Sequence, residues 1–134
     1  MIQAIIIDLN FSNLHKTNIQ EIAYVNTATG ESMCYFFNNQ RSIIFNDQKL
    51  INDSNNIHTV FNYLAKSSDV IFLVKGEKKV NFLKKLTDRD FHNLERYSCP
   101  EFKRLPYPQI YCGYHTNTHC ALKFAKAYAN WYNE

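Results

Sequence analysis

The chain has 134 residues, the usual length of a single domain, and its net charge is +3. Apolar residues make up 46% of it and aromatic residues 15%, which is enough to build a core. The chain has only three glycines and three prolines, which argues against a disordered or repetitive protein. The lysines are scattered among acidic residues without a basic run, so the charge is compatible with nucleic-acid binding but does not indicate it. We expect one folded domain over residues 1–134.

The N-terminal stretch MIQAIIIDLNF has no basic leader and reaches an aspartate after a short apolar run. It is too short and too poorly flanked for a signal peptide or a membrane span. We therefore expect an intracellular protein, in the cytoplasm or nucleus, with no membrane partner. Disulfides are uncommon there, so burial or metal binding explains the four cysteines better than bridges do.

The first part of the chain carries three strand patterns. QAIIIDLNF (residues 3–11) is a nearly continuous apolar run, which is typical of a strand buried on both faces. IQEIAYVNTATGES (19–32) alternates and then turns at Thr29-Gly30, and MCYFFNN (33–39) is predicted to be the returning strand of a hairpin. The polar, asparagine-rich segment QRSIIFNDQKLINDSNN (40–56) is predicted to be a loop with at most one short turn.

The second part alternates helix and strand patterns. IHTVFNYLAKS (57–67), capped by Asn55 or Asn56, has an apolar stripe at helical spacing. DVIFLVKG (69–76) is a second buried strand, and EKKVNFLKKL (77–86) is a basic amphipathic helix. The remaining two predicted segments are a short strand and turn in FHNLERYSCPEFKRLPYPQ (91–109) and a final helix in THCALKFAKAYANWYNE (118–134).

The resulting order is strand, strand, strand, helix, strand, helix, strand, helix. A hairpin region followed by alternating strands and helices predicts an α/β protein with a central mixed five-stranded sheet and helices on both faces. The ribonuclease H-like fold has this order, and it is the architecture that we expect.

Cys112, His115 and Cys120 lie within nine positions, at spacings that zinc sites use. Cys99, thirteen residues before Cys112, is a chemically reasonable fourth ligand because thiolates bind zinc better than carboxylates do. Four protein ligands would make a closed, structural site that pins the last helix to the sheet, whereas water as the fourth ligand would leave an open position that allows a catalytic site. The alternative is that the cysteines are small buried residues and His115 lies at the surface; Cys34 is most simply a core residue.

Three stretches resemble the exonuclease family of this fold that has four acidic residues and one histidine, the DEDDh family. Its Asp-x-Glu strand is matched by Asp8-Leu9-Asn10, followed by IQEIAYV…TGE. In VKGEKKVNFLKKL, Lys79 stands about where the aspartate of the second motif belongs. In HCALKF, His119 matches the histidine of the third motif, and Phe124 takes the place of its aspartate.

That resemblance implies a lost activity. Enzymes of this family hold two divalent cations with four carboxylates and use the histidine as a general base. Here Asp8 is the one carboxylate that remains, and a lysine in the cluster would repel the cations. We expect no two-metal exonuclease activity. His119 is then a relic base, an exposed residue or a competing zinc ligand, and Asp8 is a relic or a structural residue.

The departures resemble one branch of this family, the Maelstrom domain, which has lost the acidic cluster and carries a Glu-Cys-His-Cys zinc site. Glu21 in QEIAYV matches its glutamate, and Cys112, His115 and Cys120 match the other ligands. The resemblance therefore implies structural zinc held by these four residues, with Cys99 as the alternative to Glu21. It also implies a role in small-RNA or transposon-silencing pathways.

Three functions follow from these observations. The first is a zinc-binding, non-catalytic domain that binds single-stranded RNA or a protein partner, with positive charge from five lysines: Lys75, Lys78, Lys79, Lys84 and Lys85. The second, which the Maelstrom resemblance permits, is a metal-independent, single-strand-specific endoribonuclease. The third is a protein-interaction scaffold with no nucleic-acid role.

Overall fold

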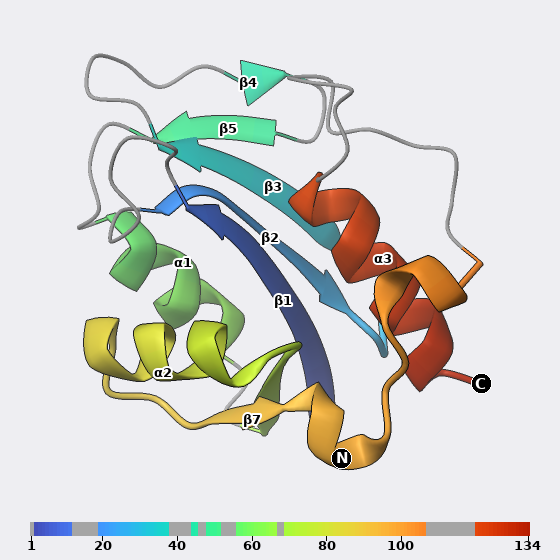
Figure 1. Cartoon of the computed structure of the whole chain (residues 1–134). Helices are drawn as coiled ribbons and strands as arrows, with labels where there is room; N and C mark the ends of the chain where they lie inside the picture. The colour runs from blue at the N-terminus through green and yellow to red at the C-terminus, as the bar shows by residue number, and fades with distance from the viewer. Residues whose placement is uncertain are drawn as a thin grey trace.

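A seven-stranded mixed sheet forms the centre of the computed structural model, with strand order β4-β5-β3-β2-β1-β6-β7 (Figure 1). The structure describes residues 2–11, 19–37, 44–45, 48–51, 56–66, 69–106 and 120–134. The strands are β1 (Gln3–Phe11), β2 (Ile19–Asn26), β3 (Ser32–Phe37), β4 (Ile44–Phe45), β5 (Gln48–Ile51), β6 (Val70–Val74) and β7 (Phe91–Asn93). The helices are α1 (Asn56–Leu64), α2 (Glu77–Leu86) and α3 (Ala121–Tyr132), with two 3₁₀ turns, η1 (Leu94–Tyr97) and η2 (Phe102–Arg104).

The first three strands form an antiparallel meander, β6 pairs in parallel with β1, and β7 pairs in parallel with β6. The β2–β3 turn is built around Asn26, whose side-chain Oδ1 accepts hydrogen bonds from the backbone N–H groups of Ala28 and Thr29. Gly30 follows with φ of 81°, a left-handed conformation that glycine adopts without a steric penalty. These local features fix the hairpin register.

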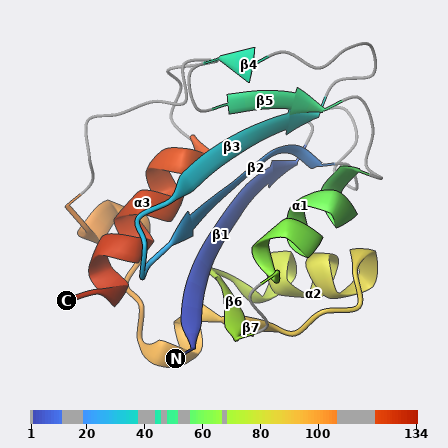
Figure 2. The same ribbon diagram turned by 180° about the vertical axis from the view of Figure 1, so that it is seen from behind.

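Helices cover both faces of the sheet (Figures 1 and 2). On one face, α3 packs on alternate residues of β1 and β2 such as Ile6 and Ala23. On the other face, Val60 of α1 and Leu83 of α2 share a cluster with Ile7 of β1. Strand β1 is therefore buried on both sides, which explains its run of isoleucines. Among the helices that the structure describes, none is long and apolar enough to cross a membrane.

The expected mixed α/β sheet with helices on both faces is confirmed, and its five predicted strands are β1, β2, β3, β6 and β7. The prediction of a loop over residues 40–56 is wrong in part, because β4 and β5 lie in it. Strand β5 pairs in parallel with β3, placing Gln48 opposite Cys34, and β4 pairs with β5. Strands of two and four residues are too short to show an alternating pattern. They are stabilised by the pairing of β5 with β3 and of β4 with β5, and not by a sequence pattern of their own.

Candidate functional site

Three polar residues lie at one end of β1 and β2, on the face that α3 covers. Asn10 of β1 is paired with Glu21 of β2, and Asp8 is paired with Ala23. Because side chains alternate along a strand, Asp8 and Asn10 share the face of Ile6, and Glu21 shares the face of Ala23. Asp8 and Glu21 are almost fully buried, with exposed fractions of 0% and 1%. Buried carboxylates are rare unless partners compensate their charge.

Among the described residues, the Glu21 carboxylate accepts hydrogen bonds from three different elements. Asn10 Nδ2 of β1 donates to Oε1 over 2.6 Å, and the backbone N–H of Ala121 donates to the same oxygen over 3.1 Å. The Cys34 thiol of β3 donates to Oε2 over 3.1 Å. Ala121 is the first residue of α3, and its N-cap residue, Cys120, gives no side-chain cap. Glu21 thus caps α3 from the sheet, where the helix dipole favours a negative charge.

Of the four residues expected to bind zinc, the structure describes Glu21 and Cys120. Glu21 contacts the N–H of Ala121, and Cys120, which directly precedes Ala121, is fully buried. Cys112, His115 and His119 lie outside the described residues. Within the described ranges, no group of three or more histidine, cysteine, aspartate or glutamate side chains is close enough to hold a metal ion.

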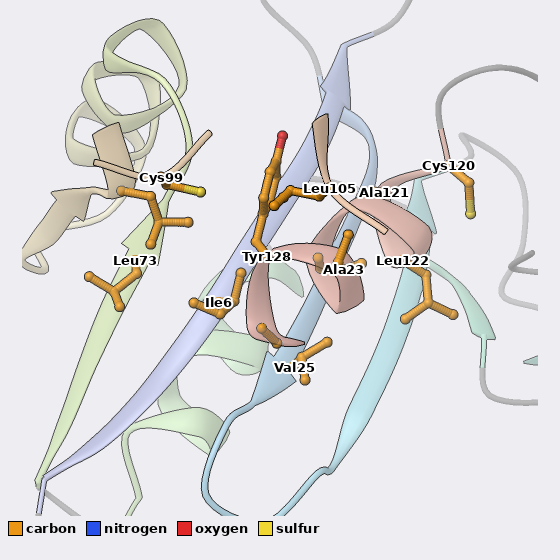
Figure 3. Close-up of a cluster of buried hydrophobic side chains, with 14 of the residues drawn as sticks. Ile6, Ala23, Val25, Leu73, Cys99, Leu105, Cys120, Ala121, Leu122 and Tyr128 are labelled. Atoms are coloured by element: carbon orange, nitrogen blue, oxygen red, sulfur yellow. The ribbon is translucent and has the colours of Figure 1, made fainter. Parts of the chain in front are cut away.

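Cys99, the alternative fourth ligand, lies elsewhere in the same cluster. Figure 3 shows it beside Leu73 of β6, on the opposite side of the cluster from Cys120. Its thiol makes a long contact of 3.6 Å with the Pro100 carbonyl oxygen. Burial raises the pKa of Cys99 to about 11. Of the two alternatives, Glu21 is the residue that contacts the start of α3.

Asp8 lies where the parallel ladder of β1 and β6 ends, one residue after the pair Ile7–Val74. Lys79, in the first turn of α2, reaches past this end and places its Nζ 2.8 Å from Asp8 Oδ1. The Asp8 side chain is 1% exposed and the Lys79 side chain 23%. The ammonium therefore compensates the negative charge of a buried carboxylate.

The loop before α2 has the geometry that brings Lys79 to Asp8. Gly76, the N-cap of α2, has φ of 108°, and its N–H donates to Asn93 Oδ1 over 3.0 Å. L-residues rarely adopt this φ, so the sharp turn from β6 into α2 depends on glycine. Helix α2 therefore starts beside the end of β1.

Phe124 occupies an apolar environment on the α3 side. Its ring stacks face to face on Phe102 of η2, with 3.7 Å between ring centroids and 3° between planes, and it meets Tyr128 edge-on. A phenylalanine supplies no oxygen ligand, so this position contributes packing between α3 and η2. Burial and, after it, the negative charge of Asp8 raise the pKa of Tyr128.

The five lysines expected to bind nucleic acid divide into two groups. Lys79 binds Asp8, and Lys75 Nζ lies 2.9 Å from Glu95 Oε2, a contact that lowers the pKa of Glu95. The other three, Lys78, Lys84 and Lys85, are exposed on α2. Part of the positive charge of this region is therefore neutralised within the protein, and the lysines of this set that face solvent lie on α2.

The sequence interpretation missed the contribution of Cys34. It was expected to be a core residue, and it is fully buried, but its thiol also binds Glu21. The hairpin register contains the signal: Cys34 pairs with Ala23, two residues from Glu21 and on the same face. No protein-family model matches the chain, and no curated protein matches it significantly.

Proposed function

We propose that this chain is a zinc-stabilised, catalytically inactive domain of ribonuclease H-like, Maelstrom-like fold that binds single-stranded RNA. The strand order β3-β2-β1-β6-β7, with an antiparallel meander followed by two parallel strands, supports this fold. The helices on both faces agree with it.

The ion pair between Asp8 and Lys79 is the main observation that supports the proposed absence of catalysis. A two-metal nuclease needs several carboxylates around its cations. Here the ammonium of Lys79 lies 2.8 Å from the buried carboxylate of Asp8, and the neutral Asn10 amide donates to Glu21. A divalent cation would have to displace an internal positive charge and would gain only one carboxylate at Asp8. The arrangement favours binding over cleavage.

Structural zinc is supported by the contact between Glu21 and the first turn of α3. Cys112, His115 and Cys120, whose spacing suits zinc, would hold the metal together with Glu21, the fourth ligand that the Maelstrom resemblance implies. Zinc bound there would tie β2 to α3 and add its binding free energy to the stability of a small domain. Metal analysis of the purified chain tests this: about one equivalent is expected, and less than roughly half an equivalent would contradict it.

RNA binding is supported by the exposed lysines of α2. Lys78, Lys84 and Lys85 present three positive charges on one helix, and side chains of this kind attract phosphates and release counterions. We expect affinity for a fluorescent single-stranded RNA to fall linearly on a log–log plot against salt concentration.

The test is anisotropy titration of that RNA at several salt concentrations. Replacing the three α2 lysines by glutamine should make the slope shallower by about 2, at roughly 0.7 for each phosphate that the variant no longer neutralises. The matched control replaces three exposed cations elsewhere, Lys66, Lys103 and Arg104, and should leave the slope unchanged. Salt-independent binding, or none, would favour a protein-interaction scaffold. RNA cleavage that persists in a chelator would instead favour the metal-independent endoribonuclease.

A further inference from the structure

Three tyrosines and one glutamate lie together on the sheet face that α1 and α2 cover, opposite the face of Glu21. Tyr24 of β2 belongs to the apolar cluster of that face, Tyr35 of β3 packs against it, and Tyr63 comes from the last turn of α1. Glu31 directly precedes β3, and its backbone continues the pairing with β2. It shares the face of Tyr35, because side chains alternate along an extended strand. We name these four residues the tyrosine cluster: Tyr24, Glu31, Tyr35 and Tyr63.

Hydrogen bonds hold the tyrosine cluster together. The Tyr63 hydroxyl donates to Glu31 Oε2 over 2.7 Å, which ties α1 to the β2–β3 hairpin. The hydroxyl groups of Tyr24 and Tyr35 are hydrogen-bonded to each other, and the two ring centroids lie 6.4 Å apart with 26° between the ring planes. Aromatic rings from a helix and from two strands therefore lie close to one carboxylate.

The tyrosine cluster carries a negative charge on Glu31. Burial raises the pKa of Tyr24 and of Tyr35, and the hydrogen bond to Glu31 raises the pKa of Tyr63, so all three phenols are neutral near pH 7. In the part of the chain that the structure describes, Glu31 forms no ion pair with a lysine, arginine or histidine. The described residues therefore leave the negative charge of this cluster uncompensated by a cation.

The tyrosine cluster has a buried side and an open side. Tyr24 is 3% exposed, whereas Tyr63 is 51% exposed and Glu31 is exposed beside it. The face of an aromatic ring carries partial negative charge, so the Tyr63 ring and the Glu31 carboxylate attract the same kind of ligand, a cation. Methylated ammonium groups suit such a site better than ammonium itself, because they are weakly hydrated and contact the rings through apolar methyl groups.

We propose that Tyr35, Tyr63 and Glu31 form a binding site for a trimethylammonium group carried by a protein partner, as in a trimethylated lysine side chain. The site depends neither on zinc nor on RNA, since it lies on a different element from the α2 lysines and on the opposite sheet face from Glu21. A choline headgroup carries the same cation, but its phosphate would place a negative charge near Glu31. The charge of Glu31 therefore favours the protein source.

The assay is NMR titration of the full chain at constant ionic strength with trimethyllysine amide, lysine amide and phosphocholine. Trimethyllysine amide is expected to bind about 5-fold more tightly than lysine amide. Tyr63→Leu removes the exposed ring and should weaken its binding about 2–30-fold, whereas Tyr63→Phe keeps the ring and most of the affinity. Glu31→Gln should weaken it about 5-fold. The matched controls, Tyr97→Leu and Glu101→Gln, change an exposed tyrosine and an exposed glutamate outside the cluster and should have no effect.

Three results would overturn this inference. The first is equal affinity for trimethyllysine amide and lysine amide, or wild-type affinity in both Tyr63→Leu and Glu31→Gln. The second is tighter binding of phosphocholine than of trimethyllysine amide, which would assign the site to a lipid headgroup. The third is a Tyr63→Leu variant that binds the fluorescent RNA more weakly without any change toward trimethyllysine amide, because the exposed ring would then stack on a base.

Discussion

Replacing Lys79 by methionine should destabilise the domain substantially, because it removes the ion-pair partner of a buried carboxylate. Methionine keeps most of the apolar stem and deletes the ammonium that lies 2.8 Å from Asp8. Breaking a buried pair by removing one partner costs about 3–5 kcal/mol, and the 23% exposure of the Lys79 side chain lets water screen part of this. We expect a loss of about 2–3 kcal/mol, a large share of the roughly 5–15 kcal/mol of a typical domain.

Urea unfolding of four proteins measures this energy: wild type, Lys79→Met, Asp8→Asn and the double variant, all at one zinc concentration. The double variant buries no charge at either position, so it should be more stable than Lys79→Met, with a coupling energy of at least about 1 kcal/mol. Lys103→Met is the control, because the pair of Lys103 with Glu101 is exposed and should contribute almost nothing. A loss below about 0.5 kcal/mol for Lys79→Met, with no coupling to Asp8, would refute the assignment of the ion pair.

Three further predictions follow from the same geometry. Gly76→Ala should lower the free energy of unfolding by about 1–3 kcal/mol, as measured by urea unfolding. The cost comes from backbone strain alone, because φ is 108° and an added Cβ would meet no atom within 4 Å. An unchanged urea midpoint would show that the loop relaxes without strain. Because burial raises its pKa to about 11, the Cys99 thiol should be alkylated at pH 8 on the order of 100-fold more slowly in the folded chain than in the urea-unfolded chain. Peptide mass spectrometry measures both rates, and equal rates would contradict the burial of Cys99. Lys75 lowers the pKa of Glu95, so the pair stabilises the fold above the ordinary glutamate pKa of about 4.3 and this contribution is lost as pH falls through the lowered value. In an NMR titration, Lys75→Met should return the pKa of Glu95 toward that ordinary value. The change in the free energy of unfolding should stay below about 1 kcal/mol, because the Glu95 side chain is half exposed. An unchanged Glu95 pKa would show that the ion pair does not form in solution.

The sequence was sufficient to predict the central strands and all three helices. The isoleucine run of β1 is buried on both faces as its pattern indicates, and the apolar stripes of α1 and α2 supply Val60 and Leu83 to the core. The helical face of α3 likewise supplies Ala125 and Tyr128. These patterns repeat over five or more residues, so local sequence is enough to identify them.

Strands β4 and β5 could not be predicted in this way. Their residues lie in a polar, asparagine-rich stretch, and their hydrogen bonds come from pairing with β3 and with each other. Such pairing is a property of the whole sheet, because an edge strand offers unpaired backbone groups to any segment that the chain brings near.

The candidate site shows the same division. Residue types and spacing alone identified Cys112, His115 and Cys120 as ligand candidates, whereas the resemblance to the exonuclease family singled out Lys79. Only the tertiary structure brought Lys79 to Asp8, across 71 positions, and the start of α3 to Glu21, across 100 positions. Local sequence determines periodicity and the chemistry of each side chain. Which buried charge meets which donor depends on sheet order and register, and these are decided by contacts between residues far apart in the chain.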